Sequence, residues 1–189
     1  MPNIRRVWIR PRPCSTCSAM HKHNLLVVKL GGSILGTRSL GRCLEVLTGL
    51  PVDWRCVVVC GGGAAANTVR EVQKNSNLDD GTASDLAIRA MGFNAQLLAT
   101  LDHRLKICLD VDTIKKTLLE DVVTPIWAPA DQGDFPGLPR SWDVTSDSLS
   151  VALAQALDAP YLLLVKAAQQ AGEDLVDEKF RELAGQWSG

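Results

Sequence analysis

The sequence lacks an excess of charge of either sign and any long apolar run. Its 189 residues hold 20 Lys and Arg against 21 Asp and Glu, which gives a formal net charge of -1. Charges this evenly balanced give no long-range field that would steer nucleic acid or an anionic membrane to the protein. We therefore expect no nucleic-acid partner. The apolar runs also fall far short of the roughly 20 residues that cross a bilayer, so we predict no membrane span.

The sequence also lacks the two common glycine-rich nucleotide motifs. Neither G-x-x-x-x-G-K-[ST] nor G-x-G-x-x-G occurs in it, which disfavours a P-loop protein and a Rossmann dinucleotide-binding protein. The hydrophobic fraction of 46% and the charged fraction of 22% are instead those of an ordinary globular chain. We therefore expect a folded protein with a single domain.

Residues 1–23 differ in composition from the rest. They contain five basic residues, three prolines and no acidic residue, and they lack the apolar segment of a secretion signal. We predict a disordered basic leader over residues 1–23, followed by one domain over residues 24–189. Met20 is a second candidate start for translation, and the sequence leaves open whether residues 1–19 are translated.

The six cysteines favour reduced thiols over disulfides, because several of them lie in or beside apolar stretches. The expected location is therefore cytoplasmic. Cys14 and Cys17, followed by His21 and His23, present four potential zinc ligands. The spacing is cramped for a zinc finger and no second cysteine pair follows, so we favour a flexible tail and predict no metal site.

Apolar runs with strand character alternate with segments of helical periodicity. The predicted strands cover residues 24–30, 55–60, 122–128 and 161–165, and the predicted helices cover residues 39–50, 64–73, 85–100 and 146–157. The polar residues 74–84 are predicted as a loop that covers the substrate. This alternation predicts an α/β fold, a three-layer α-β-α sandwich with a mostly parallel central sheet.

Two predicted strands end in glycines. Lys29 interrupts the first strand just before Gly31, Gly32 and Ser33, where glycine amides and an ammonium group can contact the same phosphate oxygens. The alternative is a turn with an incidental lysine. Gly61, Gly62 and Gly63 end the next strand and open a helix, so both clusters should meet at the carboxyl edge of the sheet.

Two further segments complete the candidate site. The stretch SWDVTSD places Trp142, Asp143 and Asp147 at the start of a helix, and Lys166 follows the strand at 161–165. Helix capping alone explains one hydroxyl and one acid but not the density of polar groups. A second lysine at a strand end supplies charge that phosphoryl transfer requires.

The segments VVKLGGS, VVVCGGGAAAN and WDVTSDSLSVALAQALDAPYLLLVK together resemble the aspartate/glutamate/uridylate kinase, or amino acid kinase, superfamily. The resemblance covers roughly residues 24–180. It is closest to the [5-(aminomethyl)furan-3-yl]methyl phosphate kinase-like branch of methanofuran and methylotroph cofactor synthesis. It implies an amino-acid-kinase-like, or carbamate-kinase-like, fold and a kinase that uses ATP and Mg²⁺.

The resemblance also implies residue roles. Lys29 and Lys166 would flank the transferred phosphoryl group, with Asp147 orienting them, while Gly31, Gly32 and Ser33 would contact the nucleotide phosphates. The acceptor would be held by residues of the second cluster and the segment before Asp147: Gly61, Gly62, Gly63, Asn67, Trp142 and Asp143. We add Arg70 from helix geometry and charge. Trp142 either stacks on a planar ring of the substrate or packs as structure.

Two alternatives stay open at this stage. In the first, the chain is an ATP-dependent kinase that acts on a small anionic acceptor, a phosphate monoester such as an aminomethylfuran methyl phosphate. In the second, it is a non-catalytic nucleotide- or ligand-binding relative. The segment Ser84-Asp85-Leu86-Ala87 departs from the closest branch, which tends to carry histidine and an aromatic residue there. The acceptor and the adenine pocket are therefore unassigned, and homo-oligomerisation is expected from the family alone.

Overall fold

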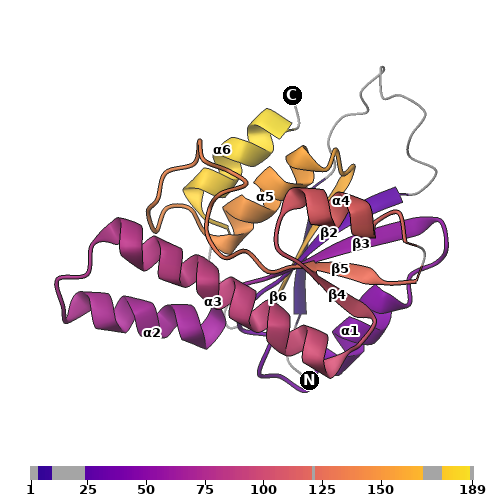
Figure 1. Ribbon diagram of the computed structural model, residues 1–189, viewed down its shortest axis with the longest axis horizontal. Helices are drawn as coiled ribbons and strands as arrows, with labels where there is room; N and C mark the ends of the chain where they lie inside the picture. Colours follow the sequence, from indigo (N-terminus) through magenta and orange to yellow (C-terminus); the bar gives the residue numbers. More distant parts are fainter. Residues whose placement is uncertain (1–3, 10–23, 121, 168–175, 188–189) are drawn as a thin grey trace.

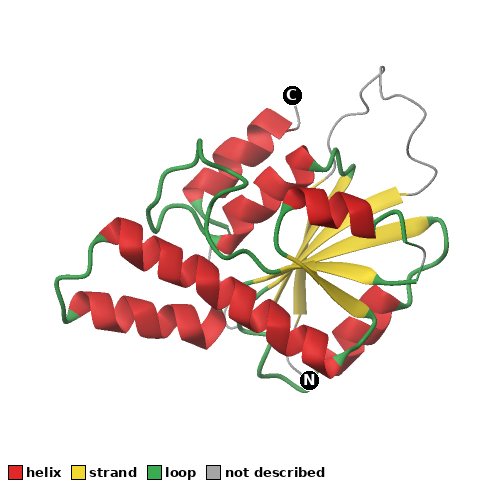
Figure 2. Cartoon of the chain, in the orientation of Figure 1, coloured by secondary structure: helices red, strands yellow, loops and turns green. Residues whose placement is uncertain are grey.

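The computed structural model describes residues 4–9, 24–120, 122–167 and 176–187. They form a six-stranded sheet with the strand order β1-β6-β2-β3-β5-β4 (Figures 1 and 2). The strands are β1 (Ile4–Ile9), β2 (Asn24–Leu30), β3 (Trp54–Cys60), β4 (Leu105–Cys108), β5 (Thr124–Trp127) and β6 (Tyr161–Ala167). Five strands run parallel, and β1 alone pairs antiparallel, with β6.

Helices cover both faces of this sheet. They are α1 (Leu40–Thr48), α2 (Gly63–Lys74), α3 (Asp80–Leu101), α4 (Val111–Thr117), α5 (Ser146–Ala156) and α6 (Glu178–Trp187). Side chains of α1 pack in one apolar cluster, and those of α4, α5 and α6 pack in the other. Helix α3 contributes to both, with Ala95 and Leu98 in the first cluster and Ile88 and Met91 in the second. The predicted α-β-α sandwich is confirmed.

Strand β2 is buried on both faces of the sheet. Leu26 and Val28 point into the cluster shared with α1 and α3, whereas Leu25 and Val27 point into the cluster shared with α5. Successive side chains of a strand face opposite sides of the sheet, so a strand covered on both faces is apolar throughout. The continuous apolar run that predicted a buried strand thus lies between two helical layers.

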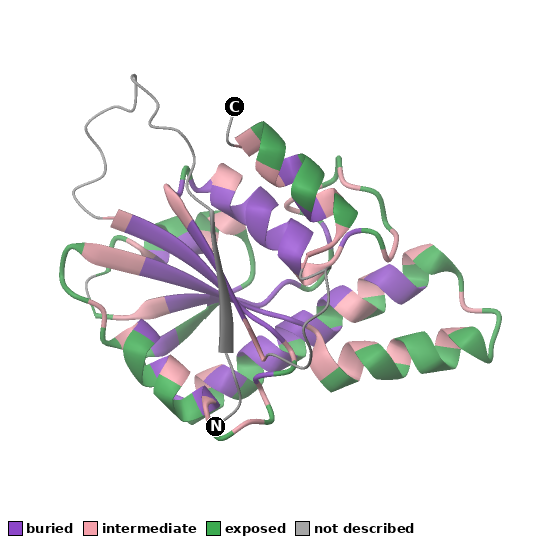
Figure 3. Cartoon of the chain, turned by 180° about the vertical axis from the view of Figure 1, so that it is seen from behind, coloured by how far each residue is buried: buried purple, intermediate pink, exposed green. Residues whose placement is uncertain are grey.

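Helix α2 stands apart from the rest. None of its residues is buried, and with the first half of α3 it forms a hairpin that extends beyond the sheet (Figures 1 and 3). Asp79 starts α3, because its side chain accepts a hydrogen bond from the amide of Thr82 at 2.9 Å. The predicted loop at residues 74–84 is therefore shorter than expected, and residues 80–84 belong to the helix.

The structure corrects the expected disorder at one place in residues 1–23. Ile4–Ile9 forms β1, an edge strand whose register pairs Ile4 with Ala167 and Ile9 with Leu162. Isoleucine, valine and tryptophan favour extended backbone, and this propensity outweighs the two adjacent arginines. Residues 10–23, with the Cys14 to His23 zinc alternative, lie outside the described residues, and the division into leader and domain stays a prediction.

Pro125 lies within β5, although a proline has no N–H to donate to a sheet ladder. It pairs with Lys106 of β4, while the pairing with β3 begins one residue later, at Ile126. The missing proline N–H thus falls where the ladder with β3 has not started, which is a position that a sheet tolerates.

Candidate active site

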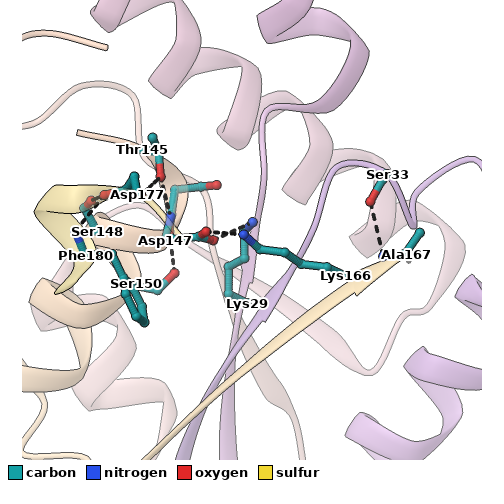
Figure 4. A network of polar contacts seen from close by, with 11 residues as sticks. Lys29, Ser33, Thr145, Asp147, Ser148, Ser150, Lys166, Ala167, Asp177 and Phe180 are labelled. Atoms are coloured by element: carbon teal, nitrogen blue, oxygen red, sulfur yellow. Dashed lines mark hydrogen bonds and ion pairs between the residues drawn. The ribbon is translucent and has the colours of Figure 1, made fainter. Parts of the chain in front are cut away.

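Three charged side chains meet at the carboxyl edge of the sheet. Lys29 lies on β2, Lys166 on the neighbouring β6, and Asp147 in the first turn of α5 (Figure 4). The Nζ atom of Lys29 is 2.7 Å from Oδ1 of Asp147, and Nζ of Lys166 donates a hydrogen bond to Oδ2 of the same carboxylate. The structure thus gathers residues that are far apart in the chain around one carboxylate.

This cluster is held out of water. Lys29 is 5% exposed and Asp147 is 4% exposed, and buried charges are tolerated mainly when they are paired. Burial lowers the pKa of the Lys29 ammonium below its ordinary value, and the attraction of Asp147 opposes this shift. Two ammonium groups against one carboxylate leave a net positive charge, which suits an anionic ligand.

The two glycine clusters touch each other. A Cβ atom added to Gly32 would lie 2.2 Å from Cα of Gly63, and one added to Gly61 would lie 2.8 Å from the amide nitrogen of Gly32. Gly63 also has a φ of +54°, a conformation that side chains other than glycine rarely adopt. Only glycine therefore allows the two strand ends to approach this closely and to present their backbone to a ligand.

The residues of the first cluster differ in what they can bind. The amide of Gly31 donates a 2.8 Å hydrogen bond to the carbonyl of Val165, so it serves the backbone between β2 and β6. Gly32 and Ser33, by contrast, line a pocket. The Ser33 hydroxyl also accepts a hydrogen bond of 3.3 Å from the amide of Ala167.

The pocket has a volume of about 250 Å³ and lies between the glycine clusters, α2, α3 and the start of α5. Its polar wall includes Asn67 and Arg70 of α2, Ser84 of α3 and Thr145 before α5. Its apolar wall is made of Ala66, Ala87, Ile88, Met91, Val144 and Leu149, and the remaining lining residues are Gly32, Ser33, Gly61, Gly62, Gly63, Trp142 and Ser146. A small anion with an apolar body would suit these walls.

Trp142 ties the segment before α5 to helix α2. Its indole Nε1 donates a 2.6 Å hydrogen bond to Oε1 of Gln73, and the guanidinium carbon of Arg70 lies 4.3 Å from the centre of its ring. Arg140 pairs with Asp85 of α3 in the same region. Arg70 therefore lies over the Trp142 ring, and stacking on a substrate ring stays one of the two predicted roles.

Asp143 was predicted to bind the substrate, but it does not line this pocket. It is exposed, and its carboxylate accepts a hydrogen bond of 3.1 Å from the hydroxyl of Ser141. The geometry gives it a role in the turn before α5.

Sequence reasoning missed Asn94. This residue is 6% exposed on α3, and its Nδ2 donates a 2.7 Å hydrogen bond to the carbonyl oxygen of Gly61. A polar side chain buried in an apolar helix requires a partner, so an asparagine among Met91, Ala95 and Leu98 was the available signal. Its partner could not be identified without the packing of α3 on β3.

Several expectations concern metal, thiols and membranes. Within the described ranges no group of three or more His, Cys, Asp or Glu side chains could hold a metal ion, and no helix is long and apolar enough to span a bilayer. Within the same ranges, no disulfide joins Cys43, Cys56, Cys60 or Cys108. Burial raises the pKa of Cys56 and of Cys60 to about 12, which keeps both thiols protonated and unreactive.

Glycine-lined strand ends beside a pair of lysines and an adjoining pocket are typical of α/β proteins that bind phosphate groups. Comparison with known families is more specific. The chain belongs to the amino acid kinase family, whose sequence model matches residues 24–169. The resemblance based on the three motif segments is thereby confirmed.

Two relatives illustrate the family. Over 140 residues the chain is 25% identical to the [5-(aminomethyl)furan-3-yl]methyl phosphate kinase of Methanocaldococcus jannaschii, covering 73% of this chain and 63% of that protein. The crystal structure of uridylate kinase from Archaeoglobus fulgidus has a TM-score of 0.52 and 22% identity, covering 71% of this chain and 59% of the other. The chain thus spans about three fifths of the length of these relatives, and the uridylate kinase confirms the fold.

Proposed function

We propose that this protein is a kinase that transfers a phosphoryl group from ATP to a small phosphate monoester. The observation that carries the proposal is the cluster of Lys29, Asp147 and Lys166 beside the two touching glycine loops. Phosphoryl transfer requires mainly positioning and stabilisation of charge on the transferred group. Two lysines that share one carboxylate supply both.

The residues divide the task. The ammonium groups of Lys29 and Lys166 contact the transferred phosphoryl group, Asp147 holds both lysines in place, and the backbone of Gly32 and Ser33 contacts the phosphates of ATP. An oxygen of the acceptor phosphate attacks the γ-phosphorus while the bond to ADP breaks. Since that oxygen is already anionic near neutral pH, positioning suffices and no strong general base is required.

The pocket beside the cluster is the proposed acceptor site. Arg70 and Asn67 provide polar contacts, and Ile88, Met91 and Leu149 provide an apolar wall. Its volume of about 250 Å³ lies just below the roughly 300 to 1,000 Å³ of drug-sized ligand sites, which favours a small acceptor. The furan phosphate ester named for the Methanocaldococcus relative is the first acceptor to assay.

Mg²⁺ would accompany the ATP phosphates. This ion usually keeps several waters and binds through substrate phosphates with one or two carboxylates, so it does not require a cluster of protein ligands. Both oxygens of Asp147 contact lysines, so the ATP phosphates and water, and not this carboxylate, would hold the ion. A cytoplasmic location is proposed with the kinase activity.

Incubation with ATP, Mg²⁺ and a panel of phosphate monoesters tests the proposal. We expect ADP formation that depends on the acceptor, together with a new diphosphate signal in ³¹P NMR. Calorimetry with ATP separates the alternative of a non-catalytic relative. Nucleotide binding without product from any acceptor would contradict the kinase and support that alternative.

A further inference from the structure

Asp177 lies just before α6, and its carboxylate accepts three hydrogen bonds. Its Oδ1 accepts hydrogen bonds from the Ser148 hydroxyl at 2.7 Å and from the Phe180 amide at 2.6 Å. Its Oδ2 accepts one from the Thr145 hydroxyl at 2.5 Å (Figure 4). The Phe180 contact caps α6, but the two hydroxyls belong to the start of α5, about thirty residues earlier in the chain.

Thr145 is the link between Asp177 and the lysine cluster. It caps α5, since its hydroxyl oxygen accepts a 3.1 Å hydrogen bond from the amide of Asp147. A hydroxyl has one proton and two lone pairs. Because the proton points to Asp177, a lone pair is directed at the amide of Asp147, and the orientation of this hydroxyl is fixed.

The position of the Asp147 amide controls the Asp147 carboxylate. Both carboxylate oxygens contact a lysine, Oδ1 that of Lys29 and Oδ2 that of Lys166. A carboxylate that must meet two ammonium groups at once tolerates little rotation of the helix turn carrying it. A charged acceptor also forms stronger hydrogen bonds than a neutral one, so Asp177 is well suited to hold that turn.

From these contacts we infer that Asp177 is a positioning residue for phosphoryl transfer: through the hydroxyl of Thr145 it sets the α5 turn that presents Asp147 to Lys29 and Lys166. This inference rests on the proposed function for its catalytic consequence. The contact geometry itself stands independently, so it can be tested independently. The late part of the chain, α6, is thereby connected to the site at the sheet edge.

Four variants test the inference by steady-state kinetics. Thr145→Val removes the hydroxyl at nearly constant volume, and Thr145→Ser keeps it. We expect kcat to fall at least about tenfold in Thr145→Val and in Asp177→Asn, with KM for ATP within about twofold of wild type, and Thr145→Ser to retain kcat within about threefold. Leu183→Ala, a buried position on α6, should lower the melting temperature while kcat per folded molecule stays unchanged.

The crystal structure of Thr145→Val provides a readout that needs no turnover. We expect the Asp147 carboxylate to leave its 2.7 Å contact with Lys29. If this contact is intact, or if Thr145→Val and Asp177→Asn keep wild-type kcat, the inference is wrong. If the wild type forms no product from any acceptor, the proposed function fails, and the crystal structure alone decides whether Asp177 positions Asp147.

Discussion

At the scale of single residues, the contact between Gly32 and Gly63 determines how close the two strand ends can lie. The backbone of Gly63 occupies the space where a Cβ atom of residue 32 would stand, and a Cβ atom on residue 63 would lie 3.3 Å from the Gly32 backbone. Neither loop can gain a Cβ atom without moving the other, because the obstructing atoms are backbone atoms. The shape of this edge of the sheet therefore depends on glycines that allow a close backbone approach.

Gly32→Ala should destabilise the protein by about 2 kcal/mol or more, because the added Cβ would lie 2.2 Å from Cα of Gly63. Gly36→Ala is the matched control, since a Cβ there would meet no atom within 4 Å. We expect its effect to stay within about 0.5 kcal/mol. Urea denaturation measures both free energies of unfolding, and equal values for the two variants would contradict the close contact.

Asp102, just after α3, controls acid stability at a distance from the site. Hydrogen bonds from Arg104 hold the pKa of Asp102 at about 2, below the roughly 3.9 of an unfolded aspartate. The resulting stability is fully present above the unfolded value and is lost as the pH falls from about 4 towards about 2.

Asp102→Asn should therefore remove this loss while lowering the free energy of unfolding at pH 7 by about 1 kcal/mol, a modest value because Arg104 is partly exposed. Thermal unfolding of both proteins between pH 2 and pH 7 measures these two changes in stability. If the stability of the wild type falls no more steeply between pH 4 and pH 2 than that of Asp102→Asn, the Arg104 contact is absent in solution.

At the scale of elements, the strands that end in glycine and β5 were predicted from the sequence, whereas β4 and α4 were not. Residues 24–30 and 55–60 carry continuous apolar runs closed by glycine, so their place at the centre of the sheet followed from the pattern. Strand β4 has four residues and α4 has seven, too few for a period to show. The available signal was Asp110, which accepts from the amide of Thr113 and caps α4.

The candidate site was predictable to a similar extent. Lys29 and Lys166 follow from the rule that parallel strands end at one edge of the sheet, and Asp147 follows from its place at a helix start. Three contacts could not be predicted from the sequence. They are those of Asn94 with Gly61, of Asp177 with the start of α5, and of Arg70 with Trp142. They depend on how α2, α3 and α6 pack, which local sequence does not specify.

Helix α2 should depend on Trp142 for its position over the pocket, because none of its own residues is buried. Trp142→Phe keeps an aromatic side chain but removes the indole N–H that donates a hydrogen bond to Gln73. We expect faster amide hydrogen exchange in α2 than in wild type and a several-fold higher KM for the acceptor, with kcat within about twofold. Trp187→Phe on α6 is the control, and unchanged α2 exchange in Trp142→Phe would contradict this role.

At the scale of the whole molecule, the outer face of α3 favours the proposed homo-oligomer. Leu97 is 46% exposed, and Phe93 and Leu101 beside it are 59% and 63% exposed. Their spacing of four residues places them on one face of the helix. Adjoining exposed apolar side chains of this kind often mark an interface, so we propose that a second copy covers this face.

Phe93→Glu should shift the protein towards monomers in light scattering after size exclusion, because a charge in an apolar interface is costly. Val46→Glu on α1 is the matched control, since Val46 is also 59% exposed. A monomeric wild type, or an equal response to both variants, would contradict an interface on α3.

The most direct test of the account is acceptor-dependent ADP formation by variants of Lys29. Lys29→Ala and the volume-conserving Lys29→Met are compared with Lys115→Ala, which changes an exposed lysine on α4. We predict a loss of more than about tenfold for both Lys29 variants, a barrier change of at least about 1.4 kcal/mol, and wild-type activity for Lys115→Ala. Full activity in a folded Lys29 variant would contradict the central claim that Lys29 and Lys166 act on the transferred phosphoryl group.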